Sequence, residues 1–504
     1  MSPQLHVVDP VFVNPNSYET ITEVLRHVGR CAGISKYGSG KRKWTFLTMD
    51  GLPFTMAYNI IQETYTCKLC NISVYGNSKK SSHCADFHQG EDSFLEREFD
   101  WVVLRIGHGH FEMNMKKAFM EINFAPFMAD ITNELGFKSS TAQKYVKKCS
   151  DNHKAWDLIC IARGALADEL LRPYVLKCLN THLPCTVNGY FAYAMNNIRN
   201  PNYKFIYEQT FVYNQAIFNY RNGLRENNHN LIMAGKEKFS PIWYARNHPK
   251  YQFIHICDTH DRFCYSDDVR ELVSTNESFS FTGNTRSGEG LDFVLENVNK
   301  KVKSILVNGV PTADDWMLAF RNYHELENVR TATHKRMGLS DPSSGSPKIR
   351  SYDEEIRKCR CLIRKSGILL NPQADFPFQS LGGKKLKLNL LDTTAIGLRN
   401  KQMYTTCLNT TMHPPKDIVY VISTDEEITV QSRTVTKASL TGSINEILNH
   451  LPHGTTTDYL LEQWKNVKKG NKQGYIDFFK SIEMIEITQD MQDAGTDEVG
   501  NEVE

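Results

Sequence analysis

The chain contains 504 residues, 40% of them hydrophobic, which is enough for about three domains with sizeable cores. Fifty-nine Lys and Arg residues nearly balance fifty-seven Asp and Glu residues, and the net charge of +2 excludes binding to nucleic acid through a globally basic surface. The N-terminal sequence lacks the features of a signal peptide, and no apolar run reaches the roughly 18 residues of a membrane span. We therefore expect an intracellular protein without a membrane partner. Thirteen scattered cysteines fit reduced thiols and one metal site better than a disulfide framework.

The N-terminal residues predict a small α/β region. Residues 5–13 are β-branched and apolar, which favours a strand. Residues 18–31 carry apolar side chains at helical spacing after a serine N-cap, which favours a helix. A second strand is predicted for residues 44–49, and it ends at Asp50, which a Gly-Leu-Pro turn follows.

The next segment, residues 65–88, holds four potential metal ligands in the spacing C-x2-C-x12-H-x4-H: Cys67, Cys70, His83 and His88. This spacing is typical of a structural zinc site, because a cysteine pair from one turn and a histidine pair from one helix can complete a tetrahedron. The alternative is a chance grouping of cysteines and histidines. The neighbouring donors Cys84 and Asp86 leave open a ligand set shifted by one residue.

The zinc segment occurs once in the chain. Fingers that read DNA sequence usually occur in arrays, each contacting about three base pairs. A single finger is therefore expected to brace a larger domain, or to help recognise one partner.

A third strand, residues 99–106, leads through a Gly-His-Gly-His turn into a helix that starts near Phe111. His108 and His110 could join Glu112 in a metal site, because clustered histidine and carboxylate ligands suit zinc or iron. A rigid strand-to-helix corner, with the histidines hydrogen-bonded to backbone groups, is the reading that these residues favour.

Residues 112–280 show helical periodicity almost throughout and predict a large all-helical insertion. Its aromatic residues could form a surface on which bases stack, although a helical core is favoured; they are Tyr190, Phe191, Tyr193, Tyr203, Phe205 and Tyr207.

The remaining sequence predicts three further parts. Residues 281–338 contain a Gly-rich loop and then helices that return to the α/β core, the first of which carries Glu296. A polar linker near residues 340–348 marks a boundary. Residues 349–487 predict a mixed α/β C-terminal region, and residues 488–504 an acidic, disordered tail.

Asp50 is the strongest single candidate for a catalytic acid, because carboxylates at strand ends can hold metal ions together with acids from neighbouring elements. Glu289 in the Gly-rich loop and Glu296 on the following helix are the other candidates. The alternatives are ordinary: Asp50 would cap its turn, and the glutamates would be solvated.

Taken in order, these elements resemble the second half of an RNase H-like DDE transposase core. Several eukaryotic groups of such transposases carry a helical insertion and a Cys-pair, His-pair zinc site between the second catalytic Asp and the catalytic Glu. The resemblance implies that Asp50 matches the second Asp, and that Glu289 or, less well, Glu296 matches the Glu. It also implies that the four Cys and His ligands hold zinc.

A closer resemblance links residues 8–338 to a multi-copy eukaryotic family of unknown function that looks transposon-derived. It rests on phrases such as DGLPFTMAYNIIQETYTCKLC, FDWVVLRIGHGHFEMNMKKAF and TGNTRSGEGLDFVLENVNK. The implied fold is α+β and predominantly helical, with a partial RNase H-like α/β region at residues 1–111 that contains the zinc module.

The resemblance also implies that the core is catalytically incomplete. Two-metal phosphoryl transfer needs at least three acids, and the first catalytic Asp is expected to be absent. Asp9 is separated from Asp50 by one helix only, which suits the third strand of such a core better than the first. We therefore expect no enzymatic activity.

The expected protein is a nuclear, zinc-binding protein associated with DNA or chromatin. Small basic clusters could contact phosphates, although most fit a solvated surface; they are Lys41–Lys43, Lys79–Lys80, Lys116–Lys117 and Lys384–Lys385. One alternative is an active Mg²⁺-dependent transposase or nuclease that uses Asp50, Glu289 and a further acid such as Glu112. Another is a helical protein-interaction scaffold with structural zinc.

Overall fold

The computed structural model describes residues 12, 17–38, 40, 42–246, 248–280, 286–306, 310–339, 351–370 and 376–387. All structural statements below concern these residues. Apart from Phe12, the strand predicted for residues 5–13 lies outside them, as do the 340–348 linker and the acidic tail.

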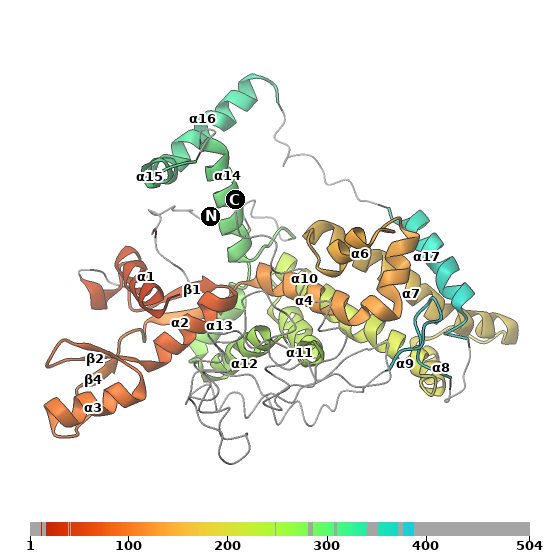
Figure 1. Cartoon of the computed structure of the whole chain (residues 1–504), viewed down its shortest axis with the longest axis horizontal. Helices are drawn as coiled ribbons and strands as arrows, with labels where there is room; N and C mark the ends of the chain where they lie inside the picture. The colour runs from red at the N-terminus through yellow and green to blue at the C-terminus, as the bar shows by residue number, and fades with distance from the viewer. Residues whose placement is uncertain are drawn as a thin grey trace, which may run out of the picture.

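The fold is α+β and predominantly helical, as the sequence predicts (Figure 1). The described residues contain five short strands, all between residues 45 and 106: β1 Thr45–Met49, β2 Thr64–Cys67, β3 Ser73–Tyr75, β4 Leu95–Arg97 and β5 Val102–Ile106. The helices up to the middle of the chain are α1 Tyr18–Cys31, α2 Gly51–Glu63, α3 Asn77–His88, α4 His108–Asn123, α5 Ala129–Glu134, α6 Ser140–Lys147, α7 Asn152–Thr181, α8 Val187–Asn197 and α9 Pro201–Glu208. The later helices are α10 Gln215–Glu226, α11 His229–Ala245, α12 Pro249–Cys264, α13 Asp267–Thr275, α14 Leu291–Ile305, α15 Ala313–Arg321, α16 Tyr323–Arg336 and α17 Asp353–Ser366.

A two-stranded parallel sheet forms the centre of the N-terminal part. β1 and β5 pair in register from Thr45 opposite Val102 to Met49 opposite Ile106. Every residue of β5 is buried, which is the usual burial of a parallel strand covered on both faces. α2 begins at Gly51, directly after the end of β1, and packs against α1, α12 and both strands.

Between these two strands the chain forms a second, antiparallel sheet in the order β3–β2–β4, with α3 beside β3. Figure 1 shows this unit projecting from one end of the molecule. α3 has a polar sequence with only His83 and Cys84 buried, so apolar packing alone gives it little support.

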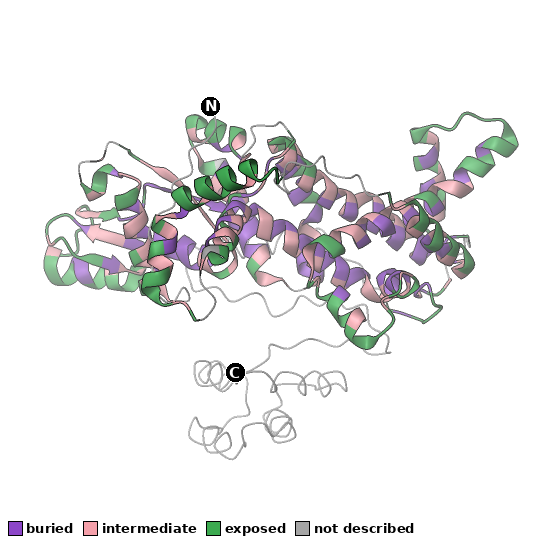
Figure 2. Cartoon of the chain, turned by 90° about the horizontal axis from the view of Figure 1, so that it is seen from above, coloured by how far each residue is buried: buried purple, intermediate pink, exposed green. Residues whose placement is uncertain are grey.

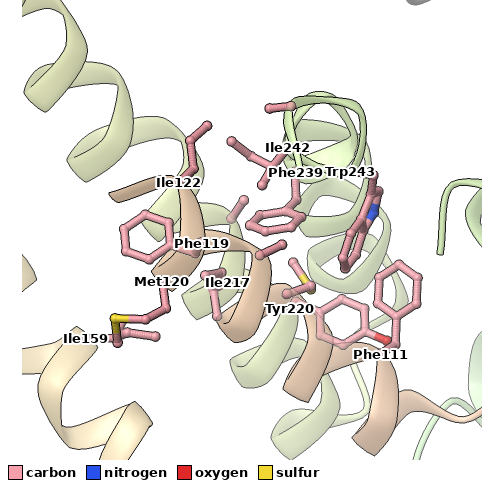
Figure 3. Close-up of a cluster of buried hydrophobic side chains, with 14 of the residues drawn as sticks. Phe111, Phe119, Met120, Ile122, Ile159, Ile217, Tyr220, Phe239, Ile242 and Trp243 are labelled. Atoms are coloured by element: carbon pink, nitrogen blue, oxygen red, sulfur yellow. The ribbon is translucent and has the colours of Figure 1, made fainter. Parts of the chain in front are cut away.

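The helical body, from α4 to α12, holds most of the hydrophobic core. Figure 3 shows side chains of α4, α7, α10 and α11 meeting there, among them Phe111, Phe119, Tyr220, Phe239 and Trp243. Figure 2 shows buried residues running along the inner faces of these helices. The aromatic stripe predicted from the sequence contributes Tyr190, Tyr203 and Phe205 to this core, whereas Phe191 is 48% exposed.

A buried network of charges joins the sheet to the helical body. The Glu277 side chain is fully buried and accepts hydrogen bonds from Arg105 of β5 and from Arg262 of α12, the latter at 2.6 Å. His108 of α4 and His229 of α11 also approach its oxygens, at 3.2 and 2.7 Å. One carboxylate therefore links the consecutive elements β5 and α4 to the consecutive helices α11 and α12, which come much later in the sequence.

The helices after residue 290 pack in two places. α14 contacts α4 and β1, and with α15 and α16 it forms a small separate cluster around Val298, Val302 and Tyr323. α17 returns to the helical body and packs on α7 and α5, so residues 351–370 and 376–387 contribute to the main core. No helix of the described ranges is long and apolar enough to cross a bilayer.

Candidate metal centre and carboxylate–histidine cluster

The four predicted metal ligands converge in the structure. One donor atom from each of Cys67, Cys70, His83 and His88 lies within 4.8 Å of the others, and no other such group of three or more donors occurs in the described ranges. Nε2 of His88 lies 3.2 Å from Cys67 Sγ, 3.4 Å from Cys70 Sγ and 3.2 Å from His83 Nε2. A tetrahedron built with Zn–S and Zn–N bond lengths has edges of about 3.3–3.8 Å. The cluster could therefore hold a metal ion, and its donors are compatible with zinc.

The local backbone brings the cysteines together. Cys67 ends β2, and the chain turns back to β3 through Asn71, which has a positive φ of 54°. The backbone N–H of Cys70 points at Cys67 Sγ at 3.4 Å. Burial acts to raise the pKa of the Cys67 thiol, but hydrogen bonds from the Cys70 N–H and from His83 outweigh it and bring that pKa to about 6. The thiolate, which is the form that binds metals, is thus favoured.

The histidines come from consecutive turns of α3. Of the spare donors that the sequence leaves open, Cys84 is buried and Asp86 is exposed. Neither belongs to the converging group. The group of donors that converges is therefore the one with the C-x2-C-x12-H-x4-H spacing.

A second cluster of ionisable groups lies at the end of β1. His110 Nε2 lies 3.3 Å from Asp50 Oδ2 and 3.2 Å from Glu296 Oε1. On the other side of the ring, His110 Nδ1 lies 2.9 Å from Asp292 Oδ2. Three elements supply this carboxylate–histidine cluster: the end of β1, the first turn of α4 and the first two turns of α14.

Asp292 fixes the orientation of His110. Its oxygens accept the backbone N–H groups of Gly109 at 3.0 Å and of His110 at 2.7 Å, which are unpaired donors at the start of α4. Glycine is needed here because a Cβ on Gly290 would lie 2.5 Å from Asp292 Oδ1 and 2.7 Å from the Gly109 nitrogen. Gly290, together with Gly107 and Gly109 opposite it, thus allows the N-termini of α4 and α14 to lie against each other.

The electrostatics of the cluster favour a charged imidazole. The pKa of His110 is raised, mainly by its hydrogen bond to Asp292 and further by the charges of Asp50 and Glu296. Burial acts to raise the pKa of Asp292, but hydrogen bonds from His110 and from the Gly109 N–H outweigh it and lower that pKa to about 2. The resulting arrangement places one positive ring among three carboxylates.

The candidate acids do not all meet in one place. Asp50 and Glu296 share the carboxylate–histidine cluster, and Asp50 accepts no capping hydrogen bond through its side chain from α2. Glu289 instead pairs with Arg225 at 3.1 Å. Glu112 is buried and pairs with Arg221 at 2.5 Å and with Lys116 at 2.9 Å.

The two histidines of the Gly-His-Gly-His turn contact different groups. His108 is buried and lies 2.7 Å from the Tyr220 hydroxyl, as part of the network around Glu277. His110 faces the carboxylate–histidine cluster. With Glu112 held by its own cations, these three residues do not meet in one metal site.

Sequence reasoning missed Asp292. A usable signal was present, because Asp292 and Glu296 stand at positions i and i+4 and therefore share one face of α14. Of the predicted basic cluster at Lys116–Lys117, Lys116 cannot contact a phosphate, because it is only 1% exposed.

Comparisons with known proteins identify no relative of this chain. No family model matches it, and no curated protein and no solved structure matches it.

Proposed function

We propose that this chain is a transposon-derived, zinc-binding protein with an RNase H-like but catalytically incomplete core, which associates with DNA or chromatin in the nucleus. The observation that carries the proposal is the meeting of Asp50 and Glu296 beside His110, although 246 positions separate the two acids in the chain.

The order of the elements supports the core assignment. Asp50 follows β1 directly, and along the chain the four proposed zinc ligands come after β1 and before its partner strand β5. The helical body then follows before α14. α14 then contacts β1 and α4, which brings Glu296 back to the end of the sheet. This contact supports Glu296, rather than Glu289, as the proposed match for the catalytic Glu of a DDE core.

The state of the cluster supports catalytic incompleteness. Two-metal phosphoryl transfer requires several free carboxylates around ions about 3.5–4 Å apart. Both oxygens of Asp292 are engaged by N–H groups, and His110 stands between Asp50 and Glu296. A positively charged ring in that place competes with the binding of a divalent cation.

Zinc content and salt-dependent DNA binding, measured on the same samples, test the proposal. The variant carries Cys67→Ser and Cys70→Ser, and the matched control carries Cys84→Ser, which changes a buried cysteine of the same module outside the four proposed ligands. We expect one zinc per chain in the wild type and the control, and loss of zinc in the variant. We also expect DNA affinity to fall steeply with salt.

The outcomes separate the alternatives. Loss of DNA binding together with zinc supports a zinc-braced nucleic-acid module. One zinc per chain without DNA binding in any sample favours the interaction scaffold. Wild-type protein without zinc contradicts the proposal.

An active nuclease is a second candidate, and the grouping of three carboxylates at Asp50, Asp292 and Glu296 is the observation that favours it. Its test is cleavage of DNA in the presence of Mg²⁺ or Mn²⁺. If the cluster is an active site, Glu296→Gln abolishes cleavage and Glu289→Gln preserves it. If cleavage is absent from the wild type, this candidate fails.

A further inference from the structure

The end of the helical body presents an exposed and uncharged surface. α7 and α8 form a helical hairpin there, and Figure 1 places α8 at the opposite end of the molecule from α3. Between Lys177 and Arg199 the sequence contains no Asp, Glu, Lys or Arg. By contrast, 23% of the whole chain consists of these residues, so a run of this length is unusual for a solvent-exposed segment.

Apolar side chains follow one side of each helix in this hairpin. On α8, Val187, Phe191 and Met195 recur every four residues and are 71%, 48% and 50% exposed. On the last turns of α7 and just beyond, Leu179 and Leu183 are 63% and 60% exposed. Val175 and Leu176 extend the α7 stripe just beyond the charge-free run, with the exposed Lys177 next to them. We call these seven side chains the hairpin patch.

The hairpin itself is well anchored, so the exposure of the patch does not result from poor packing. Tyr174 and Tyr190 are buried between the two helices, and the Tyr174 hydroxyl donates to the carbonyl of Thr186 at 3.1 Å. Ala194 is fully buried. The inner faces of α7 and α8 therefore pack into the core. The side chains of the hairpin patch remain exposed to solvent.

We propose that the hairpin patch is the contact surface of a homodimer, in which the α7–α8 hairpins of two copies of this chain pack against each other. In a two-fold symmetric interface each surface meets itself, so any charge near the axis would face a like charge. Five of the seven side chains lie in the charge-free run, so the centre of the patch avoids that repulsion. A patch for a different partner would instead gain specificity from complementary charges.

The area is sufficient for such a contact. The exposed parts of the seven side chains amount to about 600 Å² per copy, and specific interfaces begin near 600 Å² per partner. Isolated apolar patches on monomers seldom exceed this size. The asparagines at positions 180, 188, 196 and 197 supply a polar rim around the apolar centre. The inference does not depend on the proposed function.

Sedimentation of the full chain with Leu179→Glu tests this proposal against Leu318→Glu. Leu318 of α15 is a matched control, because it is 64% exposed, against 63% for Leu179, and lies outside the hairpin patch. We expect dimers at about 10 µM for the wild type and for Leu318→Glu. For Leu179→Glu we expect monomers, with the dimer dissociation constant raised at least about 100-fold by two buried like charges.

A mixing experiment distinguishes a second copy from another protein as the occupant. Leu179→Lys alone should also be monomeric, and an equal mixture with Leu179→Glu should recover dimers, because opposite charges then face each other. Circular dichroism shows whether each variant is folded. Monomeric wild type, or dimers that both glutamate variants retain equally, overturns the proposal.

Discussion

At the scale of single residues, Glu277 and Glu289 show how burial changes the value of an ion pair. Each glutamate pairs with arginine, but the Glu277 side chain is fully buried and faces Arg105 and Arg262, whereas Glu289 faces only the half-exposed Arg225. Removing one partner from a buried network leaves uncompensated charges in the interior, which costs far more than losing a surface pair.

We therefore predict that Glu277→Gln lowers the free energy of unfolding by about 3–5 kcal/mol. The matched change Glu289→Gln should lower it by no more than about 1 kcal/mol. Denaturant unfolding followed by circular dichroism measures both variants. Equal and small effects would show that the Glu277 network adds nothing to stability.

Asp261 predicts a pH dependence of stability. Burial raises the pKa of its carboxyl to about 7, with a further contribution from the charge of Asp258. Tyr58 donates to Asp261 at 3.4 Å, His260 lies 3.7 Å away and Arg262 is the nearby arginine. These groups do not offset the burial of the charge.

Because the pKa of Asp261 is raised in the folded state, the free energy of unfolding falls as pH rises. Between about pH 4 and pH 7 the folded state binds a proton that the unfolded state has lost, so this carboxyl stabilises the fold most at low pH. Its contribution, on the order of 2–4 kcal/mol, is lost as pH rises through about 7. We predict that Asp261→Asn is less sensitive to pH in this range than the wild type, as measured by unfolding at pH 5 and at pH 8.

At the scale of elements, close approach of two helices fixes the centre of the helical body. α10 and α11 pack closely, and Gly235 of α11 faces the backbone of α10. A Cβ at this position would lie 2.7 Å from the Ala216 carbonyl oxygen and 2.9 Å from the Tyr220 nitrogen. Backbone atoms cannot give way as a side chain can.

Gly235→Ala should therefore destabilise the fold by about 1–3 kcal/mol, despite the better helix propensity of alanine. Gly164→Ala on α7 is the matched control, because its Cβ would meet only the flexible end of the Ile356 side chain at 2.8 Å. We expect this control to be neutral or slightly stabilising. A thermal melt of each variant decides between the two expectations.

The elements also differ in how far sequence predicts them. α1 has the predicted bounds, Tyr18–Cys31, because its apolar face repeats at helical spacing. At residue 51 the sequence favours a turn, but the structure begins α2 there, with Pro53 in its first turn. A proline in the first helical turn loses no hydrogen bond, so the same residues suit either structure.

At the scale of the whole molecule, residues 351–370 and 376–387, which follow the 340–348 linker, pack on the helical body. Cys359 and Ile363 of α17, and five apolar residues after it, are buried in the main core; these five are Ile368, Leu369, Phe378, Leu381 and Leu386. Glu169 of α7 accepts hydrogen bonds from Arg360 at 3.0 Å and from Arg364 at 2.6 Å.

We predict that a chain ending at residue 339 is poorly soluble and much less stable than one ending at residue 387. Burial of seven apolar side chains contributes on the order of 10 kcal/mol, which is comparable to the whole net stability of a domain. Expression of the two truncated chains, followed by thermal unfolding of the soluble fraction, tests this. Equal melting temperatures would contradict a shared core.

The sequence by itself determined what depends on short spacing: the grouping of Cys67, Cys70, His83 and His88, which could hold a metal ion, and the predominantly helical class. Ligand spacing and helical periodicity act within a few turns of chain, so they can be read without knowing the fold. Only the tertiary structure decided that Glu296 and Asp50 both contact His110, and that Asp292 contacts the same ring. It also decided that Glu289 pairs with Arg225. These contacts join elements far apart in the chain, and which acid reaches the sheet depends on how α14 packs against α4 and β1.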